Sequence, residues 1–205
     1  TFQAKDKKVV VVMNIGGVIE TASWKDRPDA ILLAWQGGQE GGNSVSDLLS
    51  GKINPSGKLP MTFPISLEDH GSSANFPMEG VPMSLGSMIS RKTDKPAEEQ
   101  VANADYTKYE EGIYVGYRHF DKTNLDVSYP FGHGLSYTHF DYQNMNIELI
   151  DGSINITVQV ENTGQVAGKE VVEIYVSKPD TKIDRSVQEL KAFVKTPLLN
   201  SGESA

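Results

Sequence analysis

The sequence predicts a partial α/β (αβα) sandwich followed by an all-β sandwich, and three observations lead to this prediction. Two short apolar runs, residues 9–13 and 30–35, each lead into a glycine-containing turn, as buried parallel strands do. The second run is followed by a helical pattern over residues 42–49. From residue 137 onward the hydrophobic period changes to two, which is typical of sandwich strands. The predicted fold class is therefore α/β followed by all-β.

The first unit is predicted to be only part of an α/β layer. Val45, Leu48 and Leu49 share one face of the expected helix, and Gly51 stands where a C′ glycine ends a helix. Strand, turn and helix in this order indicate an α/β layer. Two strands do not make a stable sheet by themselves, so we expect further strands of the same sheet upstream.

The middle of the chain is expected to be a long surface loop and a linker. Residues 66–105 are polar and contain scattered Gly and Pro, and such a length without structure is unusual inside a compact domain. Residues 109–117 alternate in a way that suggests a strand docking the linker between two units. The predicted division is 1–66 for the end of the α/β unit, 67–136 for the loop and aromatic linker, and 137–205 for the β-sandwich.

The tail is predicted to supply several strands of that β-sandwich. Residues 155–160 alternate between apolar and polar, residues 161–164 are expected to turn, and residues 171–176 and 190–194 have strand composition. A seven-stranded sandwich takes roughly 100 residues. We therefore expect the sandwich to be truncated and the chain to be a piece of a longer protein.

Composition and charge exclude several classes of function. The 205 residues suffice for one or two domains, and 38% hydrophobic with 22% charged residues is typical of a globular chain. No tract approaches the roughly 18 apolar residues of a membrane helix, so we expect no membrane partner. The formal net charge of −8 argues against a nucleic-acid partner, because phosphate binding depends on clustered Lys and Arg. Without cysteine, thiolate and disulfide chemistry are excluded.

Four blocks in a fixed order carry a family resemblance. Residues 31–64 join a strand through Trp-x-x-Gly-x-x-Gly-Gly to a helix and then to Asn-Pro-Ser-Gly-Lys-Leu-Pro-x-Thr-Phe-Pro. The other three are residues 109–121 (YEEGIYVGYRHFD), 129–140 (YPFGHGLSYTHF) and 158–176. Together they resemble the C-terminal part of the family 3 glycoside hydrolases, the β-glucosidase and β-xylosidase family. In that family the α/β sandwich domain is often followed by a fibronectin-III-like domain. Lys58 stands where the family frequently has Arg.

The resemblance implies a retaining, exo-acting enzyme that hydrolyses terminal non-reducing β-D-glucosyl or β-D-xylosyl residues. Retention needs two carboxyl groups roughly 5–5.5 Å apart. The resemblance implies a nucleophilic Asp in a separate barrel domain and an acid/base Glu on a loop before this stretch. We therefore expect no catalytic residue here, a chain that is inactive alone, and the missing barrel and sandwich segments as its partners.

The same resemblance implies a β-linked oligosaccharide or glucoside as the substrate of the complete enzyme. No cofactor and no metal are expected. We expect a periplasmic or secreted location, with the cytoplasm as the alternative, and leave a homodimer open. A non-catalytic carbohydrate-binding or scaffolding module is the alternative function. The α/β signature argues against it, because a free binding module has no need of an incomplete sheet.

Two residues are candidates for contact with the substrate. Glu40 stands at a strand-to-helix turn, where open α/β sheets place ligands. The alternative, which we favour, is that its carboxylate accepts hydrogen bonds from amides at the helix N-terminus. Trp24 has polar neighbours and is placed to stack on a sugar ring or to pack beneath another domain. Trp35 is expected to be a core residue.

Other suggestive residues are expected to be structural. The glycines of residues 37–42 lack both G-x-G-x-x-G and the P-loop Lys, which excludes a nucleotide-binding domain. His119, His133 and His139 match no zinc spacing. The aromatic residues of 109–140 are interpreted as packing between two units, in preference to a saccharide platform.

Overall fold

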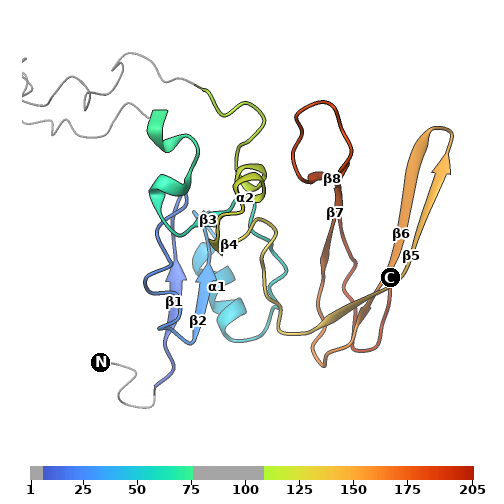
Figure 1. Cartoon of the computed structure of the whole chain (residues 1–205). Coiled ribbons are helices and arrows are strands. Elements are labelled where there is room, and N and C mark those ends of the chain that lie inside the picture. The colour runs from blue at the N-terminus through green and yellow to red at the C-terminus, as the bar shows by residue number, and fades with distance from the viewer. Residues whose placement is uncertain (1–6, 76–108) are drawn as a thin grey trace, which may run out of the picture.

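In the computed structural model of the protein, the described residues are 7–75 and 109–205. They form an α/β unit and a β unit joined by an extended segment (Figure 1). Most of the loop predicted over residues 66–105 lies outside the described residues. Among the helices within these residues, none is long and apolar enough to cross a membrane.

The first unit contains the predicted parallel strand pair. Strands β1 (Val10–Met13) and β2 (Ala30–Leu33) pair in parallel, with Val10 opposite Ala30 and Met13 opposite Leu33. Helix α1 (Gly41–Leu49) follows and begins one residue before the predicted start. Gly51 has a φ of +76°, which fits the expected C′ glycine because residues with a side chain rarely adopt this conformation. The predicted strand, turn and helix are thus confirmed.

The predicted strand over residues 109–117 is wrong. The segment forms turns and then enters helix α2 (Tyr117–Thr123). Gly112 and Gly116 have φ values of +58° and +60°, and such left-handed residues interrupt an extended strand. Tyr109, Ile113 and Val115 are 89%, 45% and 64% exposed. Of the alternating large side chains, only Tyr117 packs against neighbouring rings, so the alternation marks neither a strand nor a common buried face.

The linker joins the first unit through a short antiparallel pair. Strand β3 (Phe63–Pro64) pairs with β4 (Val127–Tyr129), and the 3-10 turns η2 (Leu67–Asp69) and η3 (Ser73–Asn75) lie between them along the chain. Phe63 is 1% exposed. The centroid of its ring lies 6.3 Å from that of Trp35 and 6.3 Å from that of Tyr129. Trp35 thus packs against the core, as expected, although it is only half-buried.

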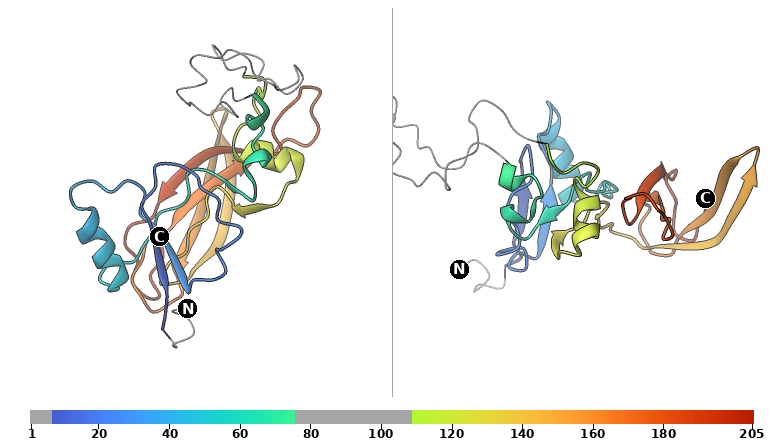
Figure 2. Two further views of the ribbon diagram at one scale, coloured as in Figure 1. Left: turned by 90° about the vertical axis from the view of Figure 1, so that its left-hand side faces the viewer. Right: turned by 45° about the horizontal axis from the view of Figure 1, so that its top comes forward.

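The second unit consists of two antiparallel hairpins: β5 (Phe140–Ile150) with β6 (Ser153–Asn162), and β7 (Val171–Val176) with β8 (Glu189–Lys195). The predicted strands over residues 155–160, 171–176 and 190–194 are therefore confirmed. Val160, Val172 and Leu199 form the buried core between the hairpins. Beyond this core, the β5–β6 hairpin projects away from the α/β unit (Figure 2).

Strand β5 was not predicted as a strand, although it has 11 residues. Its sequence contains Asp141, Asn144 and Asn146, and Asp and Asn are depleted in strands. A register shift between Gln143 and Asn146, with Asn144 at a φ of +52°, also interrupts the alternation of its side chains. Pairing with β6 therefore determines the conformation of β5 against its own composition.

Candidate functional site

The candidate site is the edge of the α/β unit where the two parallel strands end. Parallel strands present their carboxyl ends at one edge of a sheet, and open α/β sheets bind ligands there. Residues 14–29 follow β1, and residues 34–40 lead from β2 into α1. The two connections touch, because a Cβ atom added to Gly16 would lie 2.6 Å from Nε2 of Gln36. Trp24 belongs to the first connection and Glu40 to the second.

Glu40 occupies the N-cap of α1 but does not cap it with its side chain. Its backbone has φ −93° and ψ 12°, outside the extended region from which N-cap side chains reach the first helical amides. The carboxylate instead accepts a hydrogen bond of 2.6 Å from Nδ2 of Asn43. The prediction that Glu40 bonds to backbone amides is therefore wrong, and its exposed carboxylate keeps free acceptor positions.

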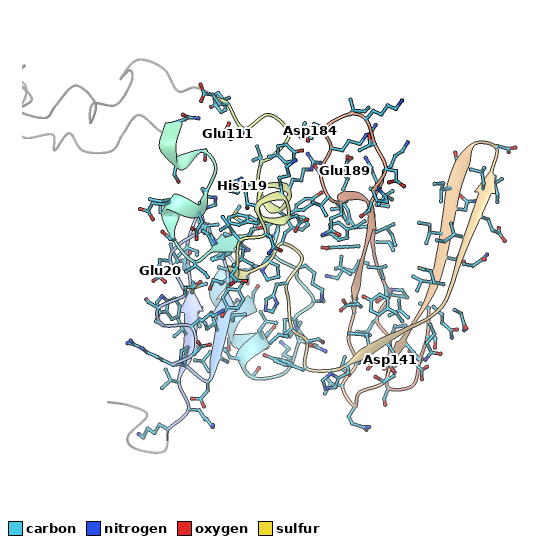
Figure 3. All side chains as sticks on the ribbon, in the orientation of Figure 1. Glu20, Glu111, His119, Asp141, Asp184 and Glu189 are labelled. Atoms are coloured by element: carbon cyan, nitrogen blue, oxygen red, sulfur yellow. The ribbon has the colours of Figure 1, made fainter. Side chains whose placement is uncertain are left out.

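Trp24 is half-buried, and its polar edge is already bonded. Its indole Nε1 donates to the backbone oxygen of Glu20 at 2.9 Å. The Glu20 carboxylate accepts from the amide (2.7 Å) and the hydroxyl (2.8 Å) of Ser23, and these bonds lower the pKa of Glu20. Figure 3 shows Glu20 on the α/β unit. The bond to Glu20 uses the only hydrogen-bond donor of the indole and helps to fix the orientation of the ring.

Strand β4 anchors the connection that carries Trp24. The buried hydroxyls of Thr21 and Ser128 lie 2.7 Å apart, and Nζ of Lys25 donates to the Ser128 carbonyl at 2.9 Å. The same ammonium group lies 5.0 Å from the centroid of the Tyr129 ring. Ser128 and Tyr129 of the linker therefore hold this loop in place. The residues in contact are about a hundred positions apart, so the sequence does not reveal the contact.

The structure does not join the two predicted site residues directly. Within residues 7–75 and 109–205, no hydrogen bond or ring contact links Trp24 to Glu40. The same residues contain no group of three or more His, Cys, Asp or Glu side chains that could hold a metal ion. The edge thus offers a carboxylate and an indole in separate loops, which suits binding of a polar ligand better than acid/base chemistry.

Sequence reasoning missed a second polar cluster, at the junction of the two units. Asn54 donates from Nδ2 to the Ala167 carbonyl at 3.1 Å. Its Oδ1 accepts from the hydroxyl of Ser136 at 3.0 Å and from the amide of Tyr137 at 2.8 Å. One side chain therefore connects the exit of the α/β unit, the linker and the β unit.

A largely buried ion pair accompanies Asn54. Nζ of Lys58 lies 2.9 Å from Oε1 of Glu170, and the two side chains are 18% and 12% exposed. Lys58 also donates to the Gly134 carbonyl at 2.9 Å, and the Tyr142 hydroxyl donates to Glu170 at 3.1 Å. Burial and then the charge of Glu170 raise the pKa of Tyr142. The Asn-Pro-Ser-Gly-Lys block was visible in the sequence, but its distant partners were not.

The aromatic residues between the units pack as expected. The Tyr117 ring lies 5.1 Å from that of Phe131 and 5.8 Å from that of Tyr175. Nε2 of His119 lies 2.9 Å from the Asp69 carbonyl, so this nitrogen carries the proton and donates. Tyr109 and Tyr137 are exceptions, at 89% and 48% exposed. Within the aromatic block, packing between the units is therefore confirmed for Tyr117 and Phe131.

Comparisons with known proteins agree with this architecture. Residues 1–137 match the glycosyl hydrolase family 3 C-terminal domain, and residues 170–205 match a fibronectin type III-like domain. A probable beta-glucosidase I from Aspergillus niger is 40% identical over 210 residues, which is 98% of this chain and 22% of the relative.

Solved structures give the same result. Beta-glucosidase 3B from Thermotoga neapolitana, in complex with glucose, has 46% sequence identity and a TM-score of 0.83 over 100% of this chain and 26% of its own. A beta-glucosidase from Kluyveromyces marxianus, also in complex with glucose, has 35% identity and a TM-score of 0.79, over 96% of this chain and 21% of its own. The chain thus spans about a fifth to a quarter of the length of these relatives.

Proposed function

The chain belongs to glycosyl hydrolase family 3, and from this premise we propose that it is the C-terminal accessory portion of a retaining, exo-acting β-glycosidase. The complete enzyme would release terminal β-D-glucosyl residues, with β-D-xylosyl residues as the second substrate class. The likeness of the whole chain to a beta-glucosidase solved with glucose carries this proposal. Retention requires two carboxyl groups that flank the scissile bond, and in this proposal other segments of the enzyme supply both.

The exposed face of the short sheet supports an accessory role. Val10 and Val12 of β1 are 45% and 41% exposed, and Leu49 of α1 is 50% exposed. A two-stranded parallel sheet is not stable alone, and parallel sheets are normally covered on both faces. We therefore propose that the upstream part of the sandwich domain adds strands beside β1 and covers these side chains. In this proposal, the chain supports the α/β sandwich domain, which closes one side of the active-site cleft of the complete enzyme.

Trp24 and Glu40 are the residues proposed to contact the substrate. The Glu40 carboxylate is exposed and bonded only to Asn43 among its described hydrogen bonds, which leaves acceptor positions for sugar hydroxyls. The Trp24 ring is held by its bond to Glu20 and offers a flat face to a sugar ring. Because the proposed substrate is an oligosaccharide, the proposed location is periplasmic or secreted, with the cytoplasm as the alternative. The proposal leaves open whether the enzyme is a homodimer.

The test is a segment exchange. In the Thermotoga neapolitana enzyme, the matching C-terminal quarter is replaced by this chain, and hydrolysis of aryl β-glucosides and β-xylosides is measured beside the isolated chain. The expected result is turnover by the exchanged enzyme and none by the isolated chain or by the relative without this segment. A folded exchanged enzyme without turnover contradicts the proposal. Binding of polysaccharide by the isolated chain, without restored hydrolysis, favours a binding module instead.

The proposed contacts are tested in the same exchanged enzyme. Glu40→Gln is expected to raise KM roughly tenfold, through loss of a charged hydrogen bond. Trp24→Ala is also expected to raise KM, through loss of stacking on the sugar ring. Glu148→Gln, on the exposed face of β5, is the matched control and should leave KM unchanged. A KM unchanged by both site substitutions removes these residues from the substrate site but leaves the accessory role intact.

A further inference from the structure

The connection between β7 and β8, residues 177–188, reaches back to the α/β unit and lies beside α2 (Figure 1). Here the Tyr114 hydroxyl is 2.5 Å from Oδ1 of Asp184 and 3.1 Å from the carbonyl oxygen of Arg185, and both oxygens accept from it. Asp184 stands above α2 in Figure 3. We call residues 177–188 the strap, because they tie the second unit across the first.

Lys122 adds an ion pair with Asp184 to this contact. Its Nζ lies 3.2 Å from Oδ1 of Asp184, 3.1 Å from the Tyr114 oxygen and 4.7 Å from the centroid of the Tyr114 ring. The hydrogen bonds from Tyr114 and Lys122 lower the pKa of Asp184, so the carboxylate is charged at neutral pH. The side chains of Lys122 and Asp184 are nevertheless 48% and 69% exposed. This attraction is therefore open to screening by salt.

Two further bonds join α2 to the end of the strap and to the start of β8. Nε2 of Gln188 donates to Oδ2 of Asp121 at 3.0 Å, and the amide of Leu190 donates to the Tyr117 hydroxyl at 2.9 Å. Ser186 lies between these contacts and is 8% exposed. The strap is thus bonded to α2 and to the turn before it, and not only laid over them.

The remaining contacts between the two units, around Lys58 and Glu170, are less exposed to solvent than the strap contacts. The Lys58 and Glu170 side chains are 18% and 12% exposed, and Asn54 joins three segments beside them. Exposed ion pairs contribute little and weaken with salt, whereas removal of one partner from a buried pair is costly. The two halves of one junction should therefore respond differently to the same change of solvent.

We propose that the junction has two parts that behave differently. The contacts of Asn54 and of the Lys58–Glu170 pair stay formed and hold the two units together, whereas the strap can detach from α2 and from the turn before it. Release separates residues 177–188 from Tyr114 and Lys122 while the two units stay attached. It is a conformational property of the chain itself and does not depend on its role in hydrolysis.

The test is hydrogen exchange of the exchanged enzyme described above, which carries all 205 residues of this chain, read by mass spectrometry on peptides covering residues 111–123 and 177–190. Raising NaCl from about 0.1 M to about 1 M shortens the Debye length from about 10 Å to about 3 Å. We expect exchange in both peptides to rise roughly two- to fivefold, as fits the loss of an exposed pair. Peptides covering residues 54–59 and 166–172 are expected to stay unchanged.

Variants separate the strap from general effects of salt. Asp184→Asn is expected to reproduce the faster exchange at low salt and to remove most of its salt dependence. Asp180→Asn, an exposed carboxylate in the same loop, is the matched control and should change neither. Unchanged exchange in Asp184→Asn would overturn the proposal. An equal rise in the peptides around Lys58 and Glu170 would also overturn it, because the junction would then open as one piece.

Discussion

Nζ of Lys58 lies 2.9 Å from Oε1 of Glu170, and this ion pair crosses the junction between the α/β unit and the β unit. Both groups are largely removed from solvent, and each has a second partner: the Gly134 carbonyl for Lys58 and the Tyr142 hydroxyl for Glu170. The pair therefore joins the units through a small bonded network, and loss of either charge leaves the other uncompensated.

Lys58→Met is expected to lower the free energy of unfolding by about 3 kcal/mol, because it strands the charge of Glu170 in a largely buried site. The double variant Lys58→Met/Glu170→Leu should cost less than the sum of the two single variants. Urea unfolding followed by circular dichroism measures both. Lys52→Met is the control: its partner Asp47 lies at 3.0 Å, but Lys52 is 70% exposed, so a loss below about 1 kcal/mol is expected. Equal losses at both sites would contradict the role assigned to burial.

Asn54→Ala is expected to cost about 2–3 kcal/mol, because it removes one donor and one acceptor that serve three bonds at a half-buried site. Asn54→Asp keeps the acceptor but sets a charged oxygen against the Ala167 carbonyl, so it should cost at least as much. Asn200→Ala is the control, since Asn200 is exposed and bonds through Nδ2 to Glu203. Thermal unfolding midpoints of the three variants are compared. Similar midpoints for the Asn54 variants and the Asn200 control would show that Asn54 does not hold the junction.

Thr62 carries a buried hydroxyl without a hydrogen-bond partner among the described residues, and the residue is 4% exposed. Thr62→Val keeps its shape and removes the unpaired oxygen, so we expect the free energy of unfolding to rise by about 1 kcal/mol. Thr21→Val is the same substitution at a residue 0% exposed, where the hydroxyl is bonded to Ser128 at 2.7 Å. It should destabilise by about 1–3 kcal/mol, since Ser128 loses its partner. Urea unfolding that gives both variants the same sign would refute this comparison.

Burial of the His70 ring lowers its pKa below the ordinary 6.5, and the charge of His119 adds to this shift. The unfolded chain therefore binds more protons than the folded chain as the pH falls below 6.5. We expect the free energy of unfolding to decrease from that pH down to the folded pKa of His70. His133 adds to the effect, because burial and then the charges of Lys58 and Lys25 lower its pKa as well.

His70→Gln should therefore weaken the decrease in stability between about pH 7.5 and about pH 5.5, without abolishing it. His139→Gln, at an exposed position, is the control and should leave the slope unchanged. Urea midpoints at the two pH values give the answer. An unaltered slope in His70→Gln would mean that burial of this ring does not contribute to the acid response.

Local patterns were sufficient for the parts of the fold that depend on near neighbours. The apolar runs at β1 and β2, the helical face and C′ glycine of α1, and the alternation in β6 and β7 all arise within a few residues, so the sequence predicted them. The ordered family blocks predicted the pairing of an α/β unit with a fibronectin-like unit. Glu40 was placed correctly at the start of α1 for the same local reason.

The contacts between residues far apart in the sequence became visible only in the tertiary structure. Asn54 and Ala167 are 113 positions apart, and Thr21 and Ser128 are 107 apart, so no local pattern could pair them. The segment around Tyr114 looked like a strand because its large side chains alternate, yet glycines at positive φ and contacts with Asp184 and Tyr175 determine its course. The sequence by itself determined most of the elements and the family of this protein, but neither β5 nor the course of residues 109–117. Long-range contacts between buried polar groups decided how its two units are held together, because their bonds form only after the chain has folded back on itself.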